Sequence, residues 1–112
     1  MSDIKSLTKY LIEFRDERNW EQFHTSKDLA TALSIEAAEL NELFLWKTPA
    51  EAEQVDQEKI ADELADVLVY ALMLAHKKGF NVEEIIRNKM KKNGEKYPVE
   101  KARGNAKKYT EL

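Results

Sequence analysis

Two pairs of acidic residues in the middle of the chain have a spacing that suits metal binding. Glu36 and Glu39 stand three residues apart, and so do Glu63 and Asp66. On a helix, residues three or four apart share one face, and apolar residues flank all four acids at those spacings. An ionised carboxylate among apolar neighbours is costly unless something compensates it. We therefore expect these acids to point into a packed face and to need a counter-charge.

The donor set indicates which cation would supply that charge. Four converging carboxylates cannot all stay ionised alone, so either some bind protons or a metal binds. An all-oxygen site favours Mg²⁺, with Mn²⁺ as a substitute, over zinc or copper. A di-iron site needs Glu-x-x-His on two helices, whereas His24 and His76 provide one such motif at most. The predicted cofactor is Mg²⁺.

The apolar periodicity is helical throughout, so helices must position the acids. Four helical regions are expected, at 3–18, from 25 or 26 to 45, from 48 to 78 with an irregular start before residue 57, and from 81 to about 93. Thr48, Pro49 and Glu51 have the pattern of a capping box with proline at the first helical position. Gly79 suits a left-handed C-terminal cap, and Asn81 an N-cap.

The chain length predicts one domain spanning residues 1–112, and the helical periodicity predicts an all-α fold, a four-helix bundle whose residues 95–112 form an irregular tail. The chain has 112 residues, no cysteine, and a formal charge of 18 minus 21, or −3. This charge does not favour a nucleic-acid partner, and no apolar run approaches the length of a membrane span. We expect a cytoplasmic protein. Apolar residues on more than one side of the helices predict a homo-oligomer.

Beyond the acids, several longer stretches resemble one enzyme family. Glu-x-x-Glu followed by Glu-x-x-Asp resembles the signature of the all-α MazG-like nucleoside triphosphate pyrophosphohydrolases. The stretches ERNWEQFHTSKDLATALSIEAAELNELFLWK, DELADVLVY, NKMKKNGEKYP and KKYTEL are similar to the dCTP pyrophosphatase branch of that family. The resemblance covers nearly the whole chain, from about Tyr10 to Leu112.

The resemblance implies hydrolysis of a nucleoside triphosphate to its monophosphate and pyrophosphate, in nucleotide-pool house-cleaning, by a dimer of dimers. It assigns catalysis and Mg²⁺ binding to Glu36, Glu39, Glu63 and Asp66. It assigns substrate binding to seven further residues: Trp20, His24, Lys27, Trp46, Tyr70, Asn93 and Lys96. Among these, Trp20 and Trp46 correspond to aromatic residues that line the base pocket, while Asn93 and Lys96 correspond to residues that approach the phosphates.

The resemblance also implies a substrate preference. The dCTP branch carries a histidine where this chain has Leu11, and a leucine cannot hydrogen-bond a base edge. We therefore expect a graded preference for pyrimidine deoxynucleotides, with dCTP or a modified dCTP first.

A non-catalytic helical module that binds other proteins is the alternative interpretation. Its apolar stripes would contact a partner, and its acids would form intersubunit ion pairs. Such a module needs basic residues facing the acids, yet there is no lysine or arginine between Leu29 and Lys47. The sequence therefore favours the enzyme.

Overall fold

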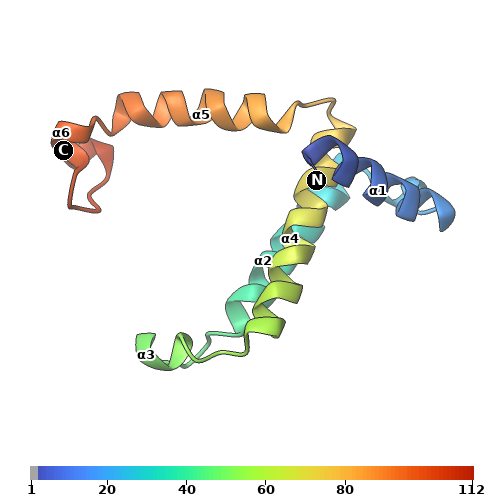
Figure 1. The fold of residues 1–112 in the computed structure, drawn as a ribbon, viewed down its shortest axis with the longest axis horizontal. Coiled ribbons are helices and arrows are strands. Elements are labelled where there is room, and N and C mark those ends of the chain that lie inside the picture. Colours follow the sequence, from blue (N-terminus) through green and yellow to red (C-terminus); the bar gives the residue numbers. More distant parts are fainter. Residues whose placement is uncertain (1–2) are drawn as a thin grey trace. The chain divides into compact units, whose positions relative to one another are not determined.

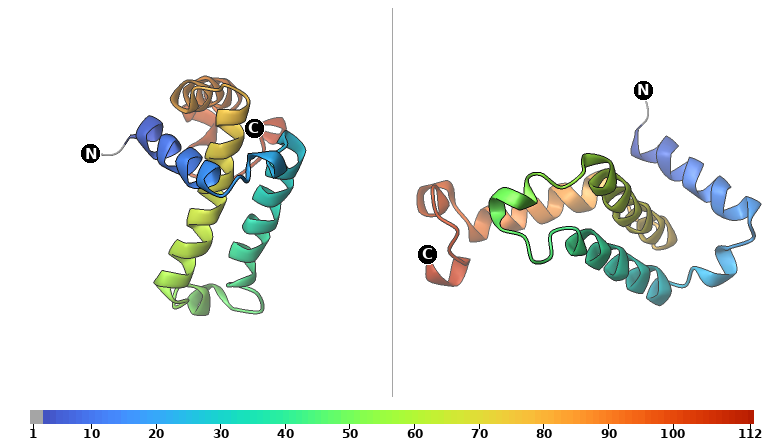
Figure 2. Two further views of the ribbon diagram at one scale, coloured as in Figure 1. Left: turned by 90° about the vertical axis from the view of Figure 1, so that its right-hand side faces the viewer. Right: turned by 90° about the horizontal axis from the view of Figure 1, so that it is seen from below.

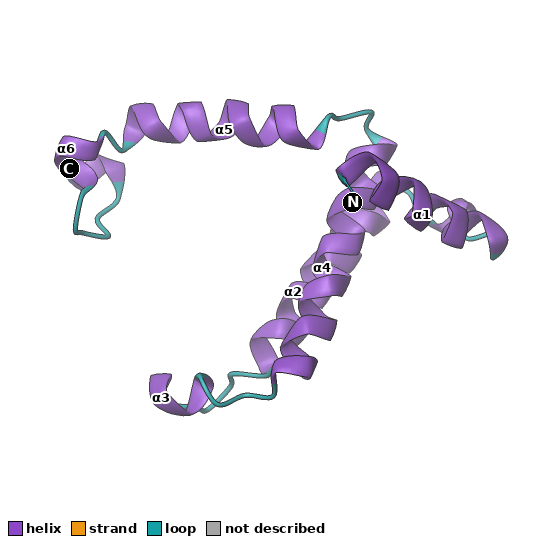
Figure 3. Cartoon of the chain, viewed as in Figure 1, coloured by secondary structure: helices purple, strands orange, loops and turns teal. Residues whose placement is uncertain are grey.

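The structure is a computed structural model that describes residues 3–112, and this part of the chain is helical with connecting loops and turns (Figures 1 and 3). The elements are α1 (Ile4–Glu17), η1 (Glu21–Phe23), α2 (Ser26–Glu42), α3 (Pro49–Ala52), α4 (Gln57–Lys77), α5 (Val82–Lys96), α6 (Val99–Ala102) and η2 (Tyr109–Glu111). Helices η1 and η2 are single 3₁₀ turns. The all-α prediction is confirmed.

The helices form two compact units, one reaching Gly79 and the other running from Phe80 to Leu112. In the first unit, α2 and α4 lie side by side as an antiparallel pair connected through α3, and α1 packs against α4 (Figures 1 and 2). Its buried apolar side chains are Leu29 from α2 and Leu72, Met73 and Ala75 from α4. The α2–α4 pair therefore brings together the two helices that carry the predicted acid pairs.

The expected capping signals at the starts of α3 and α5 and at the end of α4 are confirmed. Thr48 and Glu51 form the predicted capping box, with the Glu51 N–H donating to Thr48 Oγ1 at 3.2 Å. The Glu84 N–H donates to the side chain of Asn81 at 3.0 Å. Gly79 adopts a φ of 70°, a conformation that L side chains rarely take. These local signals mark the starts of α3 and α5 and the end of α4.

Two expected boundaries are wrong. Helix α2 ends at Glu42 rather than Leu45, because the next residues form a series of i-to-i+3 turns. The tail at 95–112 is not irregular throughout, since α5 continues through Gly94 to Lys96, and α6 and η2 follow. In the second unit, Tyr97 and Tyr109 pack edge to face with ring centroids 6.0 Å apart. This contact connects Tyr97, just after α5, to η2 near the end of the chain.

Among residues 3–112, no helix combines the length and the apolar character that crossing a bilayer requires.

Candidate active site

The α2–α4 pair brings three of the four predicted acids together. One carboxylate oxygen from each of Glu36, Glu39 and Glu63 lies within 4.8 Å of the other two. Glu36 and Glu63 are half-buried, while Glu39 is exposed. Two of these side chains come from α2 and one from α4, so the cluster exists only because the two helices pack against each other.

The cluster lacks compensating positive charge. Oε2 of Glu36 and Oε2 of Glu63 are buried and have no hydrogen-bond partner. Among the ion pairs of residues 3–112, none involves these acids. Burial raises the pKa of Glu36, and the neighbouring Glu39 carboxylate raises it further. The pKa of Glu63 is raised for the same two reasons, burial first and Glu39 second.

These features fit a hard divalent cation. Buried polar atoms are normally satisfied, and two carboxylate oxygens left without partners within one cluster offer lone pairs to a metal. All the donors are oxygens, which Mg²⁺ and Mn²⁺ prefer. A bound cation would favour the ionised forms of Glu36 and Glu63, against the burial and the repulsion that raise their pKa values.

Asp66 and Tyr70 lie close enough to the cluster to interact with it electrostatically. Asp66 stands outside the group of three oxygens, but its charge contributes to the raised pKa values of Glu36 and Glu63. Burial raises the pKa of the Tyr70 hydroxyl, and Glu36 and Asp66 raise it further. Tyr70 is therefore a protonated, half-buried phenol at neutral pH, beside the acids.

Trp20 follows α1 and contacts it. Its ring meets that of Phe14 edge to face, with centroids 6.0 Å apart and an interplanar angle of 68°. The Arg18 guanidinium lies 3.6 Å from the centroid of Phe14 and 5.9 Å from that of Trp20. The Trp20 ring thus has a packing partner in α1. Because Trp20 remains 44% exposed, part of its surface is accessible to a ligand.

His24 has a buried Nδ1 without a hydrogen-bond partner. Burial lowers the pKa of His24, and the nearby positive charge of Arg15 lowers it further. The imidazole is therefore mainly neutral at pH 7. Lys27, in the first turn of α2, is exposed.

Trp46 projects from the turns that follow α2. It is 93% exposed and adopts a φ of 64°, which is unusual for a bulky L residue. The surrounding helices therefore do not use this indole as a core residue.

Asn93 and Lys96 belong to α5, in the second unit. The Asn93 side-chain amide donates to the sulfur of Met90 at 3.7 Å. Lys96 Nζ lies 4.8 Å from the centroid of the Tyr109 ring. Within this unit, an aromatic ring from the end of the chain thus lies beside the predicted phosphate-binding lysine.

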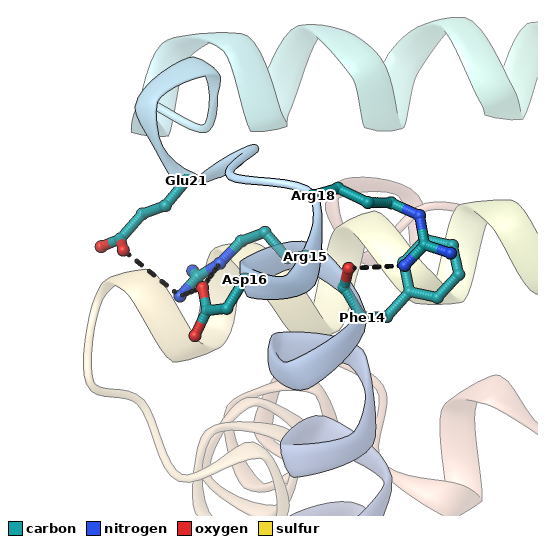
Figure 4. A network of polar contacts seen from close by, with 5 residues as sticks. All are labelled: Phe14, Arg15, Asp16, Arg18 and Glu21. Atoms are coloured by element: carbon teal, nitrogen blue, oxygen red, sulfur yellow. Dashed lines mark hydrogen bonds and ion pairs between the residues drawn. The ribbon is translucent and has the colours of Figure 1, made fainter.

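Arg15 was missed by the sequence analysis. It is 9% exposed and forms an ion pair with Asp16 at 2.8 Å and one with Glu21 at 3.6 Å (Figure 4). The signal that could have found it is its position four residues after Leu11, on the apolar stripe of α1.

The raised pKa values predict how the metal-free protein responds to pH. As pH falls from neutrality toward 4.5, the ordinary pKa of a glutamate, the folded protein binds protons at Glu36 and Glu63 before the unfolded chain does. These protons stabilise the folded state, so this contribution to the free energy of unfolding rises as pH falls. The Tm of wild type should therefore rise relative to that of Glu63→Gln as the pH is lowered, when both are measured with chelator. A difference that stays constant from pH 7 to 4.5 would contradict this.

Comparisons with known proteins agree on one family. Residues 31–112 match the model of the MazG-like family. The chain is 38% identical to dCTP pyrophosphatase 1 of Rattus norvegicus and 37% identical to that of Homo sapiens, in each case over 97% of this chain and 67% of the relative. The crystal structure of a pyrophosphatase from Archaeoglobus fulgidus is similar, with a TM-score of 0.83 and 40% identity, over 88% of this chain and 94% of that one. The chain belongs to the MazG-like family, and the predicted enzyme class, a nucleoside triphosphate pyrophosphohydrolase, is confirmed.

Proposed function

We propose that this enzyme hydrolyses a (deoxy)nucleoside triphosphate to the monophosphate and pyrophosphate in a Mg²⁺-dependent reaction. The observation that carries this proposal is the group of three carboxylates within 4.8 Å, in which two buried oxygens have no partner. Glu36, Glu39, Glu63 and Asp66 would hold the metal. Bound Mg²⁺ supplies charge neutralisation for the triphosphate and for the leaving pyrophosphate.

The remaining proposed site residues would bind the substrate. Trp20 and Trp46 offer flat, accessible indole rings on which a base can stack, and Tyr70 places a neutral phenol beside the acids. Asn93 and Lys96 would approach the phosphates, and His24 and Lys27 would also bind the substrate. His24 would do so as a neutral imidazole, which can donate one hydrogen bond without a charge.

The proposed substrate class is the pyrimidine deoxynucleoside triphosphates, with dCTP or a modified dCTP preferred by a graded margin. Two of the relatives are dCTP pyrophosphatases by name, and a stacking site tolerates different bases because every base has a π-face. This substrate class implies a role in nucleotide-pool house-cleaning in the cytoplasm, carried out by one functional domain that comprises residues 1–112.

The test is incubation with a panel of nucleoside triphosphates and Mg²⁺, followed by separation of the products. Monophosphate with pyrophosphate is expected, and diphosphate with phosphate would contradict the proposed bond cleavage. A kcat/KM that favours a purine triphosphate tenfold or more would refute the pyrimidine preference and leave the reaction type intact.

Mg²⁺ should stabilise the folded protein even without nucleotide. A ligand at about 100 times its Kd contributes about 2.7 kcal/mol to the free energy of unfolding, which corresponds to a rise in Tm of roughly 10 °C for a domain of this size. Calorimetry with and without Mg²⁺ measures the shift, with NaCl at matched ionic strength as the control for screening. If NaCl produces the same shift, the acids do not bind Mg²⁺ specifically.

The proposed assembly is a homo-oligomer, as a dimer of dimers. Large apolar side chains on the α2–α4 pair are exposed in the single chain, among them Ile35 at 53% and Leu68 at 54%. An exposed apolar surface of this kind is typical of an interface between subunits. Light scattering of the active enzyme should give a multiple of 13.0 kDa. An active species of that single mass would contradict the assembly.

A further inference from the structure

Arg15 is the buried charged residue of the described chain, and the proposed reaction does not use it. It lies near the end of α1, where its side chain is 11% exposed. Burying an arginine is costly unless its charge is paired, and replacing a buried ion pair with apolar residues often costs no stability. Stability alone is therefore a weak reason for an arginine at this position. The partners of Arg15 indicate a different role.

The guanidinium of Arg15 connects two consecutive elements. Its Nε donates to Asp16 Oδ1 at 2.9 Å, and its Nη2 lies 2.8 Å from the same oxygen. The same Nη2 lies 3.6 Å from Glu21 Oε2, on η1 (Figure 4). A planar guanidinium can serve both carboxylates at once. Arg15 thus ties η1 to the end of α1.

The segment between these elements is a tight turn that carries proposed substrate-binding residues. The Trp20 N–H donates to the Arg15 carbonyl at 3.1 Å, and Asn19 adopts a left-handed φ of 54°. The Gln22 side chain donates to the Asn19 carbonyl at 2.9 Å. Trp20 lies within this turn, and His24 follows η1 directly. Because Trp20 directly precedes η1 and His24 directly follows it, a contact that holds η1 in place also holds the backbone of both residues.

We propose that Arg15, through its ion pair with Glu21, is a positioning residue that holds residues 19–24 so that Trp20 and His24 face the substrate. This inference rests on the proposed function, because only that function makes those two side chains ligands of the nucleotide. The closeness of Arg15 to His24, which contributes to the lowered pKa of the imidazole, agrees with a shared local structure.

The decisive variant is Glu21→Gln, which removes the charge of the partner and preserves its size. Glu21 is largely exposed, with a side chain 66% accessible, so the fold should survive. We expect KM for the nucleotide to rise about fivefold while kcat stays within about twofold, because a misplaced binding segment weakens ground-state and transition-state binding alike. The matched control is Glu17→Gln. Glu17 pairs with Arg18 at the same 3.6 Å but does not connect α1 to η1, so its KM should equal that of wild type.

A double-mutant cycle separates positioning from general destabilisation. Arg15→Lys keeps the charge but loses the planar fork that reaches both acids. If the two residues act through one contact, the double variant should raise KM no more than the worse single variant does. Additive increases in KM would mean that the two residues act independently, which would overturn the inference.

Tryptophan fluorescence tests the same idea without turnover. In a Trp46→Phe background, Trp20 is the remaining tryptophan. Glu21→Gln should make Trp20 more accessible to acrylamide, and Glu17→Gln should not. Unchanged quenching together with an unchanged KM would overturn the inference. If wild type releases no pyrophosphate from any triphosphate, the proposed function fails instead, and the quenching comparison alone then decides whether Arg15 holds the turn.

Discussion

Replacing Glu63 with glutamine is expected to reduce turnover by about a thousandfold while raising the thermal stability of the metal-free protein. Glutamine keeps the shape of the side chain but removes one of three charges that lie within 4.8 Å of one another. Without metal, the ionised Glu63 destabilises the folded protein, which is consistent with its raised pKa. With substrate and Mg²⁺, the same charge is needed to hold the metal. Asp66→Asn should behave in the same way.

The control for this prediction is Asp62→Asn. Asp62 precedes Glu63 on α4, is exposed, and lies outside the group of three oxygens. Its kcat/KM should stay within about twofold of wild type, as is usual for a change of surface charge. Pyrophosphate release gives the activities, and melting curves recorded with chelator give the stabilities. Near wild-type activity of Glu63→Gln would show that the acid cluster is not the catalytic centre.

Local signals in the sequence were sufficient to predict the starts of α3 and α5. The Thr48 and Glu51 capping box and the Asn81 cap each depend on contacts between residues three apart, which sequence spacing displays directly. The i, i+3 spacing of the acids likewise predicted that both helices turn carboxylates toward one place. The three-acid group also needed α2 and α4 to pack in register, and that contact became visible only in the structure.

The end of α2 could not be predicted in the same way. Leu43, Phe44 and Leu45 continue the apolar character of the helix, and no glycine or proline marks its end before Thr48 and Pro49. The backbone nevertheless switches to i-to-i+3 hydrogen bonds, and Trp46 takes a positive φ. Residue type gives little warning of a left-handed tryptophan, because such a conformation is rare.

The end of α5 also differs from the expected position, because Gly94 does not stop the helix. The helix expected from residue 81 to about 93 continues through Gly94, because a glycine within a helix costs only about 1 kcal/mol relative to alanine. The helix ends instead just before Tyr97, whose helical conformation is disfavoured by the following Pro98. Beyond it, the ring of Tyr97 contacts that of Tyr109, twelve residues later in the chain. Periodicity cannot display a contact of that kind.

The type and position of Arg15 give little sign in the sequence of a positioning role, whereas those of Trp20 do indicate a functional role. A tryptophan is rare enough to attract attention, whereas an arginine near a helix end is ordinarily solvated. Only the position of Glu21, after a turn whose geometry depends on Asn19, shows that Arg15 has a partner outside its own helix.

Truncating Trp46 to alanine should raise KM by about tenfold for the preferred nucleotide and reduce the differences in KM among bases. Stacking of one base on an aromatic ring contributes about 1–3 kcal/mol by alanine substitution. Because the indole is 93% exposed in the free chain, its removal leaves no cavity, and Tm should stay nearly unchanged. Any change in KM then reports lost substrate contact rather than a damaged fold.

Trp46→Phe is the matched variant, because it retains a ring of smaller area at the same backbone position. We expect its KM to lie between those of wild type and Trp46→Ala, and the Mg²⁺-induced rise in Tm to be equal in all three, since stacking acts on the base and not on the metal. Steady-state kinetics with dCTP, dTTP and dATP give the ranking. If alanine and phenylalanine variants both keep the wild-type KM, Trp46 does not contact the base. The graded pyrimidine preference would then have to come from Trp20 and Tyr70, the other aromatic residues of the proposed site.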